Sequence, residues 1–540
     1  MNYTDVNNEV LASWKEKDVF HKSIDEKEGC PQFVFFEGPP SANGHPGIHH
    51  VMGRTIKDTF LRYKTMKGYQ VKRKAGWDTH GLPVELSVEK SLGITKEDIG
   101  KKISVDEYND ACRKNVMMYT DEWTQLTDKM GYFVDLEHPY ITYEIKYIES
   151  LWWLLKQLYD KDLLYKGYTI QPYSPAAGTG LSSHELNQPG CYRDVKDTTV
   201  TAQFKVADEN PLGIDTELPL YILAWTTTPW TLPSNTALCV GPKIDYVAVK
   251  GHNPYTGEEA VYILAENRLG VYFQPSKDEE GNDIPVEILW RGKGAELVDI
   301  HYRQLMPWVK PCAIEGDKVI VKEAEAFRVI LGDYVTTEDG TGIVHIAPTF
   351  GADDAKVAKD AGIPSLFVID KAGDTRPMVD FQGKYFVRED MNGDFVSACV
   401  NESYWKHSGD YVKNAYDPKY NVGGKYDEKA AQKDMDLNVV ICLEMKEEGS
   451  AFKIEKHVHN YPHCWRTDKP VLYYPLDSWF IRSTAKKERM FELNKTINWH
   501  PESTGSGRFG KWLENLNDWN LSRSRYWGTP LPIWRNRDTK

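Results

Sequence analysis

The stretch FVFFEGPPSANGHPGIHH, residues 33–50, decides the fold of this chain. Residues 33–36 form a short apolar run of the kind that a buried parallel strand needs, and the glycines and prolines of 38–44 predict a tight loop. A predicted helix follows, so His49 and His50 stand at a helix N-terminus just past the carboxyl end of a strand. Ligands of open α/β sheets bind in that crevice, and helix N-termini favour anions. The alternative is a plain strand–loop–helix unit with two exposed histidines.

A second strand is predicted in YQVKRKAGWDTHGLPVE, residues 69–85, which ends in a Gly-Trp-Asp turn. Asp78 and His80 therefore fall near a second strand end, beside the first loop if the two strands are neighbours. Between about 190 and 420 the chain changes to short β-branched runs separated by Gly, Pro, Asn and Asp. This pattern predicts an α/β protein that is interrupted by a separate, mainly β module.

The bulk composition excludes several classes of protein. The 540 residues carry a net charge of −13, which argues against a protein that coats nucleic acid by bulk electrostatics. The eight cysteines are spread singly without a CxxC pair, so neither a disulfide framework nor a zinc knuckle is indicated, and reduced cytosolic thiols are expected. The sequence has neither a signal-peptide pattern nor a run of about 18 apolar residues, so we expect a cytoplasmic protein with no membrane partner.

The motifs that carry chemistry occur in a fixed order. The chain lacks GxxxxGK(S/T), and it lacks GxGxxG after a strand. It has instead GPPSANGHPGIHH, GWDTHGLPVE, AWTTTPWTLPSN, GTGIVHIAP, YPHCWR and DWNLSRSRYWGTPLPIW, in that order. Together these motifs resemble the class I aminoacyl-tRNA synthetases, and within that class the isoleucyl-tRNA synthetases of the eukaryotic-like branch, which also occurs in bacteria. Valyl relatives resemble PPPNVTG in place of GPPxANG, and leucyl relatives resemble PYPSG.

The resemblance implies a Rossmann-type catalytic domain that is interrupted by an editing domain. We expect the first catalytic half at 1–190, the mainly β editing domain at 191–420, a connector at 421–465 and the start of the second catalytic half at 466–540. The family's KMSKS signature and its anticodon-binding domain are not found. The chain is therefore expected to be the N-terminal part of a longer protein, with aminoacylation lost from this fragment and editing retained.

The resemblance also implies a first reaction, in which the isoleucine carboxylate attacks the α-phosphate of ATP and the aminoacyl group then passes to tRNA(Ile). ATP is expected to arrive with Mg²⁺, and the protein is expected to act as a monomer. His49 and His50 would be the catalytic residues, because positioned donors stabilise charge on the phosphates. The resemblance assigns the other binding residues as follows: Pro40, Asn43 and Gly47 with both histidines for ATP, and Glu37, Gly38, Pro39, Asp78 and His80 for isoleucine, with Asp78 on its ammonium group. Asp78 could instead cap a helix, and His80 could be a satisfied core histidine.

The first loop departs from the family pattern at one point. The usual HxGH signature is replaced by Gly47, Ile48, His49 and His50. A histidine at the position of the usual glycine should crowd the adenosine unless the loop shifts. We hypothesise that ATP binding survives through a rearranged loop, whereas mupirocin-type inhibitors shaped to the usual loop bind poorly and the variant confers antibiotic resistance. The alternative is a damaged loop with slow activation.

The second implied reaction is proofreading. Isoleucyl enzymes are the standard illustration that one methylene is worth only about 1–3 kcal/mol in a binding pocket, so a second site is expected. The resemblance assigns to it Thr226, Thr227, Thr228, Trp230, Thr231, Asn235, His345 and Asp354. Asp354 would hold the α-amino group of a misacylated tRNA, while the threonines and His345 would surround the ester and its water. The run of threonines could instead reflect ordinary β-propensity.

One cluster resembles a metal site. His457, His459, His463 and Cys464 lie close together, but their spacing matches no strong zinc pattern, so no structural metal is predicted. Three other functions stay open: a valyl-tRNA synthetase, a stand-alone aminoacyl-tRNA deacylase, and a non-catalytic tRNA-binding module.

Overall fold

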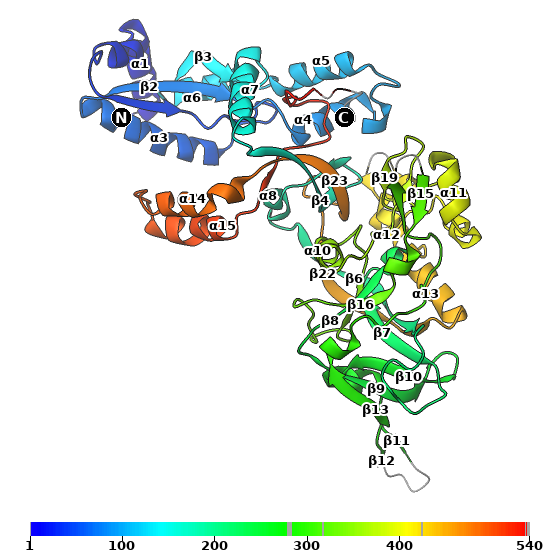
Figure 1. Ribbon diagram of the computed structural model, residues 1–540. Coiled ribbons are helices and arrows are strands. Elements are labelled where there is room, and N and C mark those ends of the chain that lie inside the picture. The colour runs from blue at the N-terminus through cyan, green and yellow to red at the C-terminus, as the bar shows by residue number, and fades with distance from the viewer. Residues whose placement is uncertain (1, 278–282, 316–317, 423–424, 535, 537–540) are drawn as a thin grey trace. The chain divides into compact units, whose positions relative to one another are not determined.

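The chain divides into two compact units, which are described separately (Figure 1). Unit 1 comprises Met1–Lys166 and Trp479–Lys540, and unit 2 comprises Gly167–Ser478. The predicted mainly β insertion lies inside unit 2, and the four-part division drawn from the sequence stays a prediction. The computed structural model describes residues 2–277, 283–315, 318–422, 425–534 and 536.

Unit 1 contains a parallel sheet surrounded by helices. Within its described residues, three strands pair in the order β1-β2-β3, and both pairs are parallel. The elements of unit 1 are α1 Tyr3–Glu16, α2 Val19–Asp25, β1 Gln32–Phe36, α3 Ile48–Met66, β2 Gln70–Trp77, α4 Leu82–Leu92, α5 Val105–Val116, α6 Thr120–Lys129, β3 Asp135–Ile141, α7 Ile145–Tyr159, α14 Lys487–Asn494, α15 Gly510–Glu514 and β24 Trp519–Asn520. The predicted first strand, loop, helix and second strand are thereby present, and β1 pairs in parallel. The prediction that the first strand is buried is wrong: Val34 is 53% and Phe36 60% exposed, because no described element covers that face of β1.

The ends of β1 and β2 meet as predicted. The backbone N–H of Asp78 donates to the carbonyl of Pro40 at 3.0 Å, and Ser41 forms a parallel bridge with Asp78. The loop after β1 therefore continues the parallel pairing past the ends of both strands. This pairing fixes the first loop beside Asp78.

Helix α3 packs one face on the sheet and leaves the other face open. Leu61 is buried in a core with Val71 and Tyr132, whereas Ile56 and Phe60 are each at least 60% exposed. The apolar periodicity of 51–63 thus predicts the helix correctly. The periodicity does not predict which of these residues are buried. The face of α3 that carries Ile56 and Phe60 is not covered by any other described part of unit 1.

Unit 2 is mainly β, as expected. Among its described residues nine strands form one sheet, in which β13-β9-β10-β7-β17-β8-β16 follow one another and β6 pairs with both β7 and β22. The elements of unit 2 are β5 Thr179–Gly180, α8 Ser183–Leu186, β6 Tyr192–Lys205, β7 Leu220–Thr226, β8 Ala237–Val240, β9 Asp245–His252, β10 Glu259–Ala265, α9 Leu269–Tyr272, β11 Ser276–Lys277, β12 Asp283–Ile284, β13 Ile288–Lys293, β14 Cys312–Glu315, β15 Lys318–Val321, β16 Arg328–Leu331, β17 Ile343–Ile346, α10 Ala352–Asp360, β18 Val368–Ile369, β19 Thr375–Arg376, α11 Gly393–Cys399, β20 Asn421–Val422, β21 Lys425–Tyr426, α12 Glu428–Ala431, α13 Leu437–Glu447 and β22 Ala451–Pro462. The chain crosses between the units within β4, Leu164–Ser174, and β23, Leu472–Ile481.

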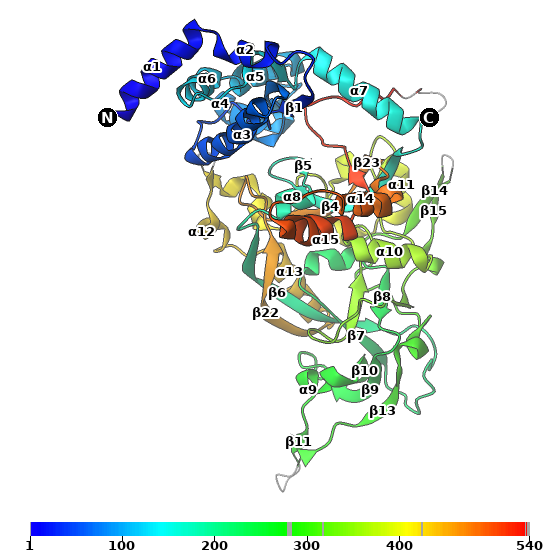
Figure 2. The same ribbon diagram turned by 90° about the vertical axis from the view of Figure 1, so that its left-hand side faces the viewer.

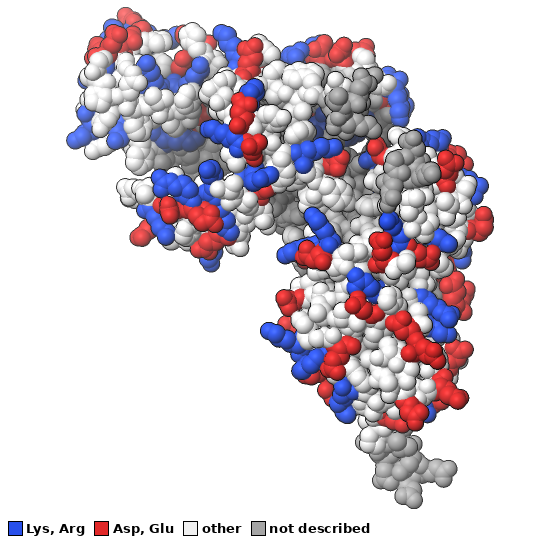
Figure 3. Space-filling view, in the orientation of Figure 1, with Lys and Arg blue, Asp and Glu red and all other residues white. Residues whose placement is uncertain are grey.

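The two longest strands described in unit 2, β6 and β22, pair with each other. They run antiparallel and side by side in both Figure 1 and Figure 2, from Tyr192 opposite Pro462 to Ala202 opposite Ala451. Helix α13 packs on them; Asp436 caps its start by accepting from the N–H of Asn438. On the face of unit 2 that Figure 3 shows, basic and acidic side chains are interspersed.

Among the described residues, every helix is too short or too polar to span a bilayer.

Candidate functional site

Unit 1 has a pocket of about 280 Å³ at the N-terminus of α3. Its lining combines the loop after β1, one face of α3 and a ring from α6: Glu37, Gly38, Pro39, Pro40, His49, His50, Gly53, Arg54, Lys57 and Trp123. Six residues singled out from the sequence therefore come together here. Asn43, Gly47, Asp78 and His80 lie outside this lining.

His50 has a defined tautomer at the start of α3. Its Nδ1 accepts the backbone N–H of Gly47 at 2.9 Å, so the ring proton is on Nε2. Burial, together with the neighbouring His49 and Arg54, lowers the pKa of His50 below its ordinary value. The edge of this ring contacts Trp123, with the centroids 4.7 Å apart. A neutral His50 can therefore donate from Nε2 to an anion.

Two cations that the sequence analysis missed lie on the same face of α3. Arg54 and Lys57 follow His50 by four and seven residues, the spacing that places side chains on one helical face. The Arg54 guanidinium donates to Thr127 Oγ1 at 2.8 Å and lies 4.9 Å from the centre of the Trp123 ring. Arg54 and Lys57, together with the N-terminus of α3, make the pocket suitable for anions such as phosphates.

Glu37 forms the floor of this pocket. It is 3% exposed, and its carboxylate accepts from Lys57 and from the hydroxyl of Tyr132. The hydroxyl of Tyr140 donates to the Glu37 carbonyl at 2.6 Å. Because the carboxylate already has these partners, Glu37 holds the loop and Lys57 in place.

The structure explains why glycine and histidine exchange places in the loop. A Cβ atom on Gly47 would lie 2.8 Å from Cε1 and 2.9 Å from Nδ1 of His49. The backbone of Gly47 is extended, with φ −111°, so any residue could adopt its conformation. Glycine therefore leaves room for the His49 ring, which is tilted by 43° to the His50 ring with the two centroids 3.8 Å apart.

Asp78 and His80 lie beside the pocket, one and three residues past β2. Asp78 is exposed, and Oδ1 accepts the backbone N–H of His80 at 3.5 Å. The imidazole of His80 lies 5.5 Å from Trp527, whose indole N–H donates to the Thr79 carbonyl at 2.5 Å. Burial lowers the pKa of His80.

Asn43 helps to shape the first loop. Its side-chain oxygen accepts from the hydroxyl of Ser41 at 2.8 Å. Glu85 in α4 accepts the backbone N–H groups of both Tyr526 and Trp527 and pairs with Arg525 at 3.4 Å. Arg525 is therefore an ion-pair partner of Glu85 within unit 1.

A second cluster, the threonine–histidine network, lies in unit 2. It comprises Thr226 at the end of β7, Thr228, Thr231 and Asn235 in and around the 3₁₀ turn Pro229–Ser234, and His345 in β17. The Thr231 hydroxyl donates to the Thr228 carbonyl at 2.8 Å and lies 2.9 Å from His345 Nε2. Thr226 Oγ1 accepts the N–H of Thr228 at 3.1 Å. Five of the eight residues predicted for proofreading are therefore hydrogen-bonded together.

His345 is neutral in this network. It is 8% exposed, and burial lowers its pKa to about 4. Asn235 Nδ2 faces Nδ1 of the ring at 3.4 Å, and Thr231 faces Nε2. With both nitrogens occupied, His345 shapes the site and is not placed to act as a general base.

The other three predicted residues surround the network. Thr227 is half-buried between Thr226 and Thr228, and Trp230 packs edge-on against Phe350 at 4.9 Å. The backbone N–H of Trp230 donates to Asn438, a contact with α13 that sequence reasoning missed.

Asp354 lies at the start of α10 and is tied to β17. Its Oδ2 accepts the N–H of Ala347 at 3.0 Å. Burial raises the pKa of Asp354 to about 6, so the carboxylate is ionised at pH 7. The second carboxylate oxygen can thus bind a cation such as an ammonium group.

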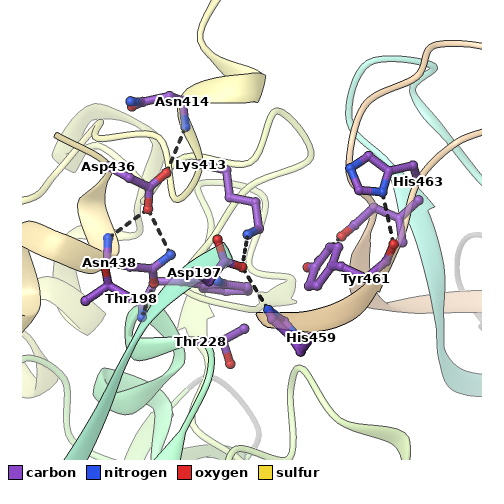
Figure 4. Close-up of polar contacts among 12 residues, drawn as sticks. Asp197, Thr198, Thr228, Lys413, Asn414, Asp436, Asn438, His459, Tyr461 and His463 are labelled. Carbon is purple, nitrogen blue, oxygen red and sulfur yellow. Dashed lines mark hydrogen bonds and ion pairs between the residues drawn. The ribbon is translucent and has the colours of Figure 1, made fainter. Parts of the chain in front are cut away.

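A partly buried ion pair lies near Thr228 of this network (Figure 4). Asp197 on β6 lies between Lys413 Nζ, 3.4 Å away, and His459 Nε2, 3.0 Å away. The Lys413 ammonium also lies 4.5 Å from the ring centre of Tyr461. Register places Thr198 opposite Lys456, and Lys456 donates to the Thr198 hydroxyl at 2.6 Å.

The histidines that resemble a metal site have other partners. His459 binds Asp197, and His463 Nδ1 donates to the carbonyl of Tyr461 at 3.0 Å (Figure 4). A search of the described residues for three or more His, Cys, Asp or Glu side chains that could hold a metal ion found no such group.

The chain belongs to the class I tRNA synthetases for isoleucine, leucine, methionine and valine, because the model of that family, "tRNA synthetases class I (I, L, M and V)", matches residues 9–540. Its fold is accordingly the class I synthetase fold. The chain is 68% identical over 542 residues to the isoleucine–tRNA ligase of Bacteroides thetaiotaomicron, a match that covers 99% of this chain and 47% of that protein. It is 62% identical over 543 residues to the isoleucine–tRNA ligase of Porphyromonas gingivalis, covering 99% and 46%.

The chain spans about half the length of these curated relatives. The findings do not support the eukaryotic-like branch suggested by the motifs. Among solved structures, the chain is similar to the ternary complex LeuRS–tRNA–LeuAMS of Agrobacterium radiobacter K84, with 15% identity, 85% of this chain and 49% of that chain covered, and a TM-score of 0.29. A likeness at that score does not bear on the fold.

Proposed function

We propose that the protein activates isoleucine with ATP in unit 1, transfers it to tRNA(Ile), and hydrolyses Val-tRNA(Ile) in unit 2. The observation that carries this proposal is the presence, in one chain, of a cation-lined pocket at a helix N-terminus and a buried threonine–histidine network with a carboxylate beside it. Whole-protein activity is proposed because relatives that are 68% and 62% identical to this chain carry the name isoleucine–tRNA ligase.

The pocket in unit 1 suits the phosphates of ATP. His50 Nε2, Arg54 and Lys57 are donors on one helical face, and the free N–H groups of α3 add to their field. The family uses ATP, usually with Mg²⁺, which would arrive on the phosphates. Asp78, exposed beside the first loop, suits the ammonium group of isoleucine.

The network in unit 2 suits ester hydrolysis. The hydroxyls of Thr226 and Thr228 lie 3.4 Å apart and can bind the ester and a water, while the Asp354 carboxylate binds the α-ammonium group of valine. Rejection by a second site is needed because the valine side chain is smaller than isoleucine and enters the first site. A monomeric state and a cytoplasmic location stay predictions.

The alternatives are less well supported. Valyl specificity is not favoured, because relatives with up to 68% identity are named for isoleucine. A stand-alone deacylase would have no use for the cation-lined pocket of unit 1, and a non-catalytic tRNA-binding module would have none for the threonine–histidine network of unit 2.

We expect Gly47→Ala to weaken ATP binding about fivefold, the loss of roughly one hydrogen bond. The added methyl group displaces the His49 ring, which is exposed and can move without unfolding the chain. Isothermal titration of the 540-residue chain with ATP measures the effect. Gly44→Ala is the matched control, because a Cβ there meets nothing within 4 Å. Equal ATP affinity in Gly47→Ala and the wild type would contradict the role of His49.

We expect the advantage that Asp354 gives to Val-tRNA(Ile) hydrolysis to disappear in acid. Its pKa of about 6 means that the carboxylate protonates below pH 6 and no longer attracts the ammonium group. The ratio of kcat/KM between the wild type and Asp354→Asn cancels the pH dependence common to both proteins. This ratio should fall about tenfold per pH unit below pH 6. A ratio that is constant from pH 7 to pH 5 would exclude a titrating Asp354 from binding.

A further inference from the structure

A tyrosine that no motif contains closes the end of the threonine–histidine network. The hydroxyl of Tyr302 donates to Asn235 Oδ1 at 2.7 Å, and the side chain is 3% exposed. Its ring is held edge-on against Phe204, with centroids 5.3 Å apart, and near Phe327 at 6.1 Å. Burial raises the pKa of Tyr302 well above its ordinary value, so the phenol stays protonated and acts as a donor.

This donor and the carbonyl of Ala237 together fix the orientation of the Asn235 amide. The amide oxygen accepts from Tyr302, and on the opposite side Nδ2 donates to the carbonyl of Ala237 at 2.8 Å, which can only accept. The second N–H of Asn235 therefore faces His345 Nδ1 at 3.4 Å, with the Ile346 carbonyl beside it at 3.5 Å.

The amide in turn selects one tautomer of His345. A ring nitrogen that faces an N–H must be unprotonated, so Nδ1 accepts and the proton is on Nε2. Nε2–H then donates to Thr231 Oγ1 at 2.9 Å, and the Thr231 hydrogen goes to the carbonyl of Thr228 at 2.8 Å. Every hydrogen bond from Tyr302 to Thr228 therefore points in the same direction, an arrangement in which each bond strengthens the next.

We propose that Tyr302 is a positioning residue for the hydrolytic site of unit 2, which acts through Asn235 to hold His345 as the Nε2–H tautomer. In the opposite tautomer, Nε2 would accept the hydrogen of Thr231, and that hydroxyl would turn away from the Thr228 carbonyl. The Thr226 and Thr228 hydroxyls would then lose the fixed geometry with which they bind the ester. The catalytic consequence rests on the proposed function, whereas the tautomer does not.

Tyr302→Phe tests the proposal because it removes only the hydroxyl and keeps the ring between Phe204 and Phe327. The 540-residue chain is labelled with ¹⁵N-histidine, and long-range ¹H–¹⁵N spectra report the protonated nitrogen of each ring. The signals of His345 are identified as those missing from His345→Gln. We expect a pure Nε2–H tautomer in the wild type and a measurable Nδ1–H population in Tyr302→Phe. We also expect kcat for Val-tRNA(Ile) hydrolysis to fall about tenfold, with KM changed less than twofold.

Asn235→Asp gives a second, opposite readout. A carboxylate oxygen in place of the NH₂ group favours a proton on His345 Nδ1, so the spectrum should shift to the Nδ1–H or doubly protonated form. Tyr474→Phe is the matched control. Tyr474 is 1% exposed and donates to the carbonyl of Val379 at 2.9 Å, outside the network, so this variant should keep the wild-type spectrum of His345 and the wild-type kcat.

The proposal is overturned if His345 is the Nδ1–H tautomer in the wild type. It is also overturned if Tyr302→Phe keeps both the wild-type spectrum of His345 and the wild-type kcat. If the wild-type chain does not hydrolyse Val-tRNA(Ile), the proposed function fails, and the spectra alone then decide whether Tyr302 sets the tautomer.

Discussion

We expect Asp197→Asn to lower the free energy of unfolding of unit 2 by about 3 kcal/mol. Asp197 is the carboxylate that pairs with Lys413, whose side chain is 9% exposed, and with His459 (Figure 4). Asparagine keeps the shape and one hydrogen bond to His459, but it leaves a buried ammonium group without its counter-charge. Removing one partner of a buried ion pair costs more than removing both, because the remaining charge stays desolvated.

The pH dependence of this effect has a defined sign. Burial alone would raise the pKa of Asp197, but the hydrogen bond from His459 and the charge of Lys413 outweigh it and lower the pKa to about 2. A carboxyl group with a lowered pKa in the folded state stabilises the protein above its unfolded pKa near 4, and this contribution is lost as the pH falls toward 2. The wild type should therefore lose its advantage over Asp197→Asn between pH 4 and pH 2.

Urea unfolding of the wild type, Asp197→Asn, Lys413→Met and the double variant measures the coupling between the two residues. The double variant should be more stable than Asp197→Asn, since it no longer buries an unpaired charge. Asp468→Asn is the matched control; its ion pair with Arg193 has a carboxylate that is 74% exposed, so we expect a change below about 0.5 kcal/mol. If Asp197→Asn and Asp468→Asn had the same free energy of unfolding, the ion pair of Asp197 would not stabilise the fold.

We expect Asp354→Ala to reduce kcat/KM for the proposed hydrolysis of Val-tRNA(Ile) at least about 100-fold, the value of a charged contact in a site shielded from water. One oxygen of Asp354 accepts the N–H of Ala347, which holds the carboxylate in place for the ammonium group of the substrate. Because Asp354 is proposed to bind the substrate, the loss should appear mainly as a higher KM. Free valine added to the assay should not restore hydrolysis by the variant.

Unfolding would not explain such a loss. The raised pKa of Asp354 means that the folded protein disfavours its charge, so alanine should leave the midpoint of thermal unfolding unchanged or raise it. Asp353→Ala is the matched control, because Asp353 immediately precedes Asp354 in α10 and its side chain is exposed. Equal kcat/KM in Asp354→Ala and Asp353→Ala would show that Asp354 does not bind the substrate.

Local sequence patterns predicted the parts of the protein that depend on neighbours in the chain. The apolar run at 33–36 and the glycine-rich loop predicted β1, the turn and the start of α3. The pairing of Asp78 with the first loop followed from the rule that parallel strands bring their carboxyl ends to one edge. The helical spacing from His50 to Arg54 and Lys57 was also available, and applying it to the charged residues would have found both cations of the pocket.

Contacts between distant parts of the chain could not be predicted in this way. Tyr302 is 67 residues from Asn235, and Lys413 is 216 residues from Asp197. Nothing in DIHYRQL or in VKNAY marks a polar group that will be buried against one partner, because the partner is chosen by the packing of unit 2. The same holds for Gly47, whose need for a missing Cβ is seen only when the His49 ring folds back over it.

The most direct test of the account is the release of valine from Val-tRNA(Ile) by the 540-residue chain, followed beside Ile-tRNA(Ile) at the same concentration. The account predicts repeated turnover of the valyl ester well above its spontaneous hydrolysis, while the isoleucyl ester stays at the spontaneous rate. Equal and uncatalysed loss of both esters would contradict it.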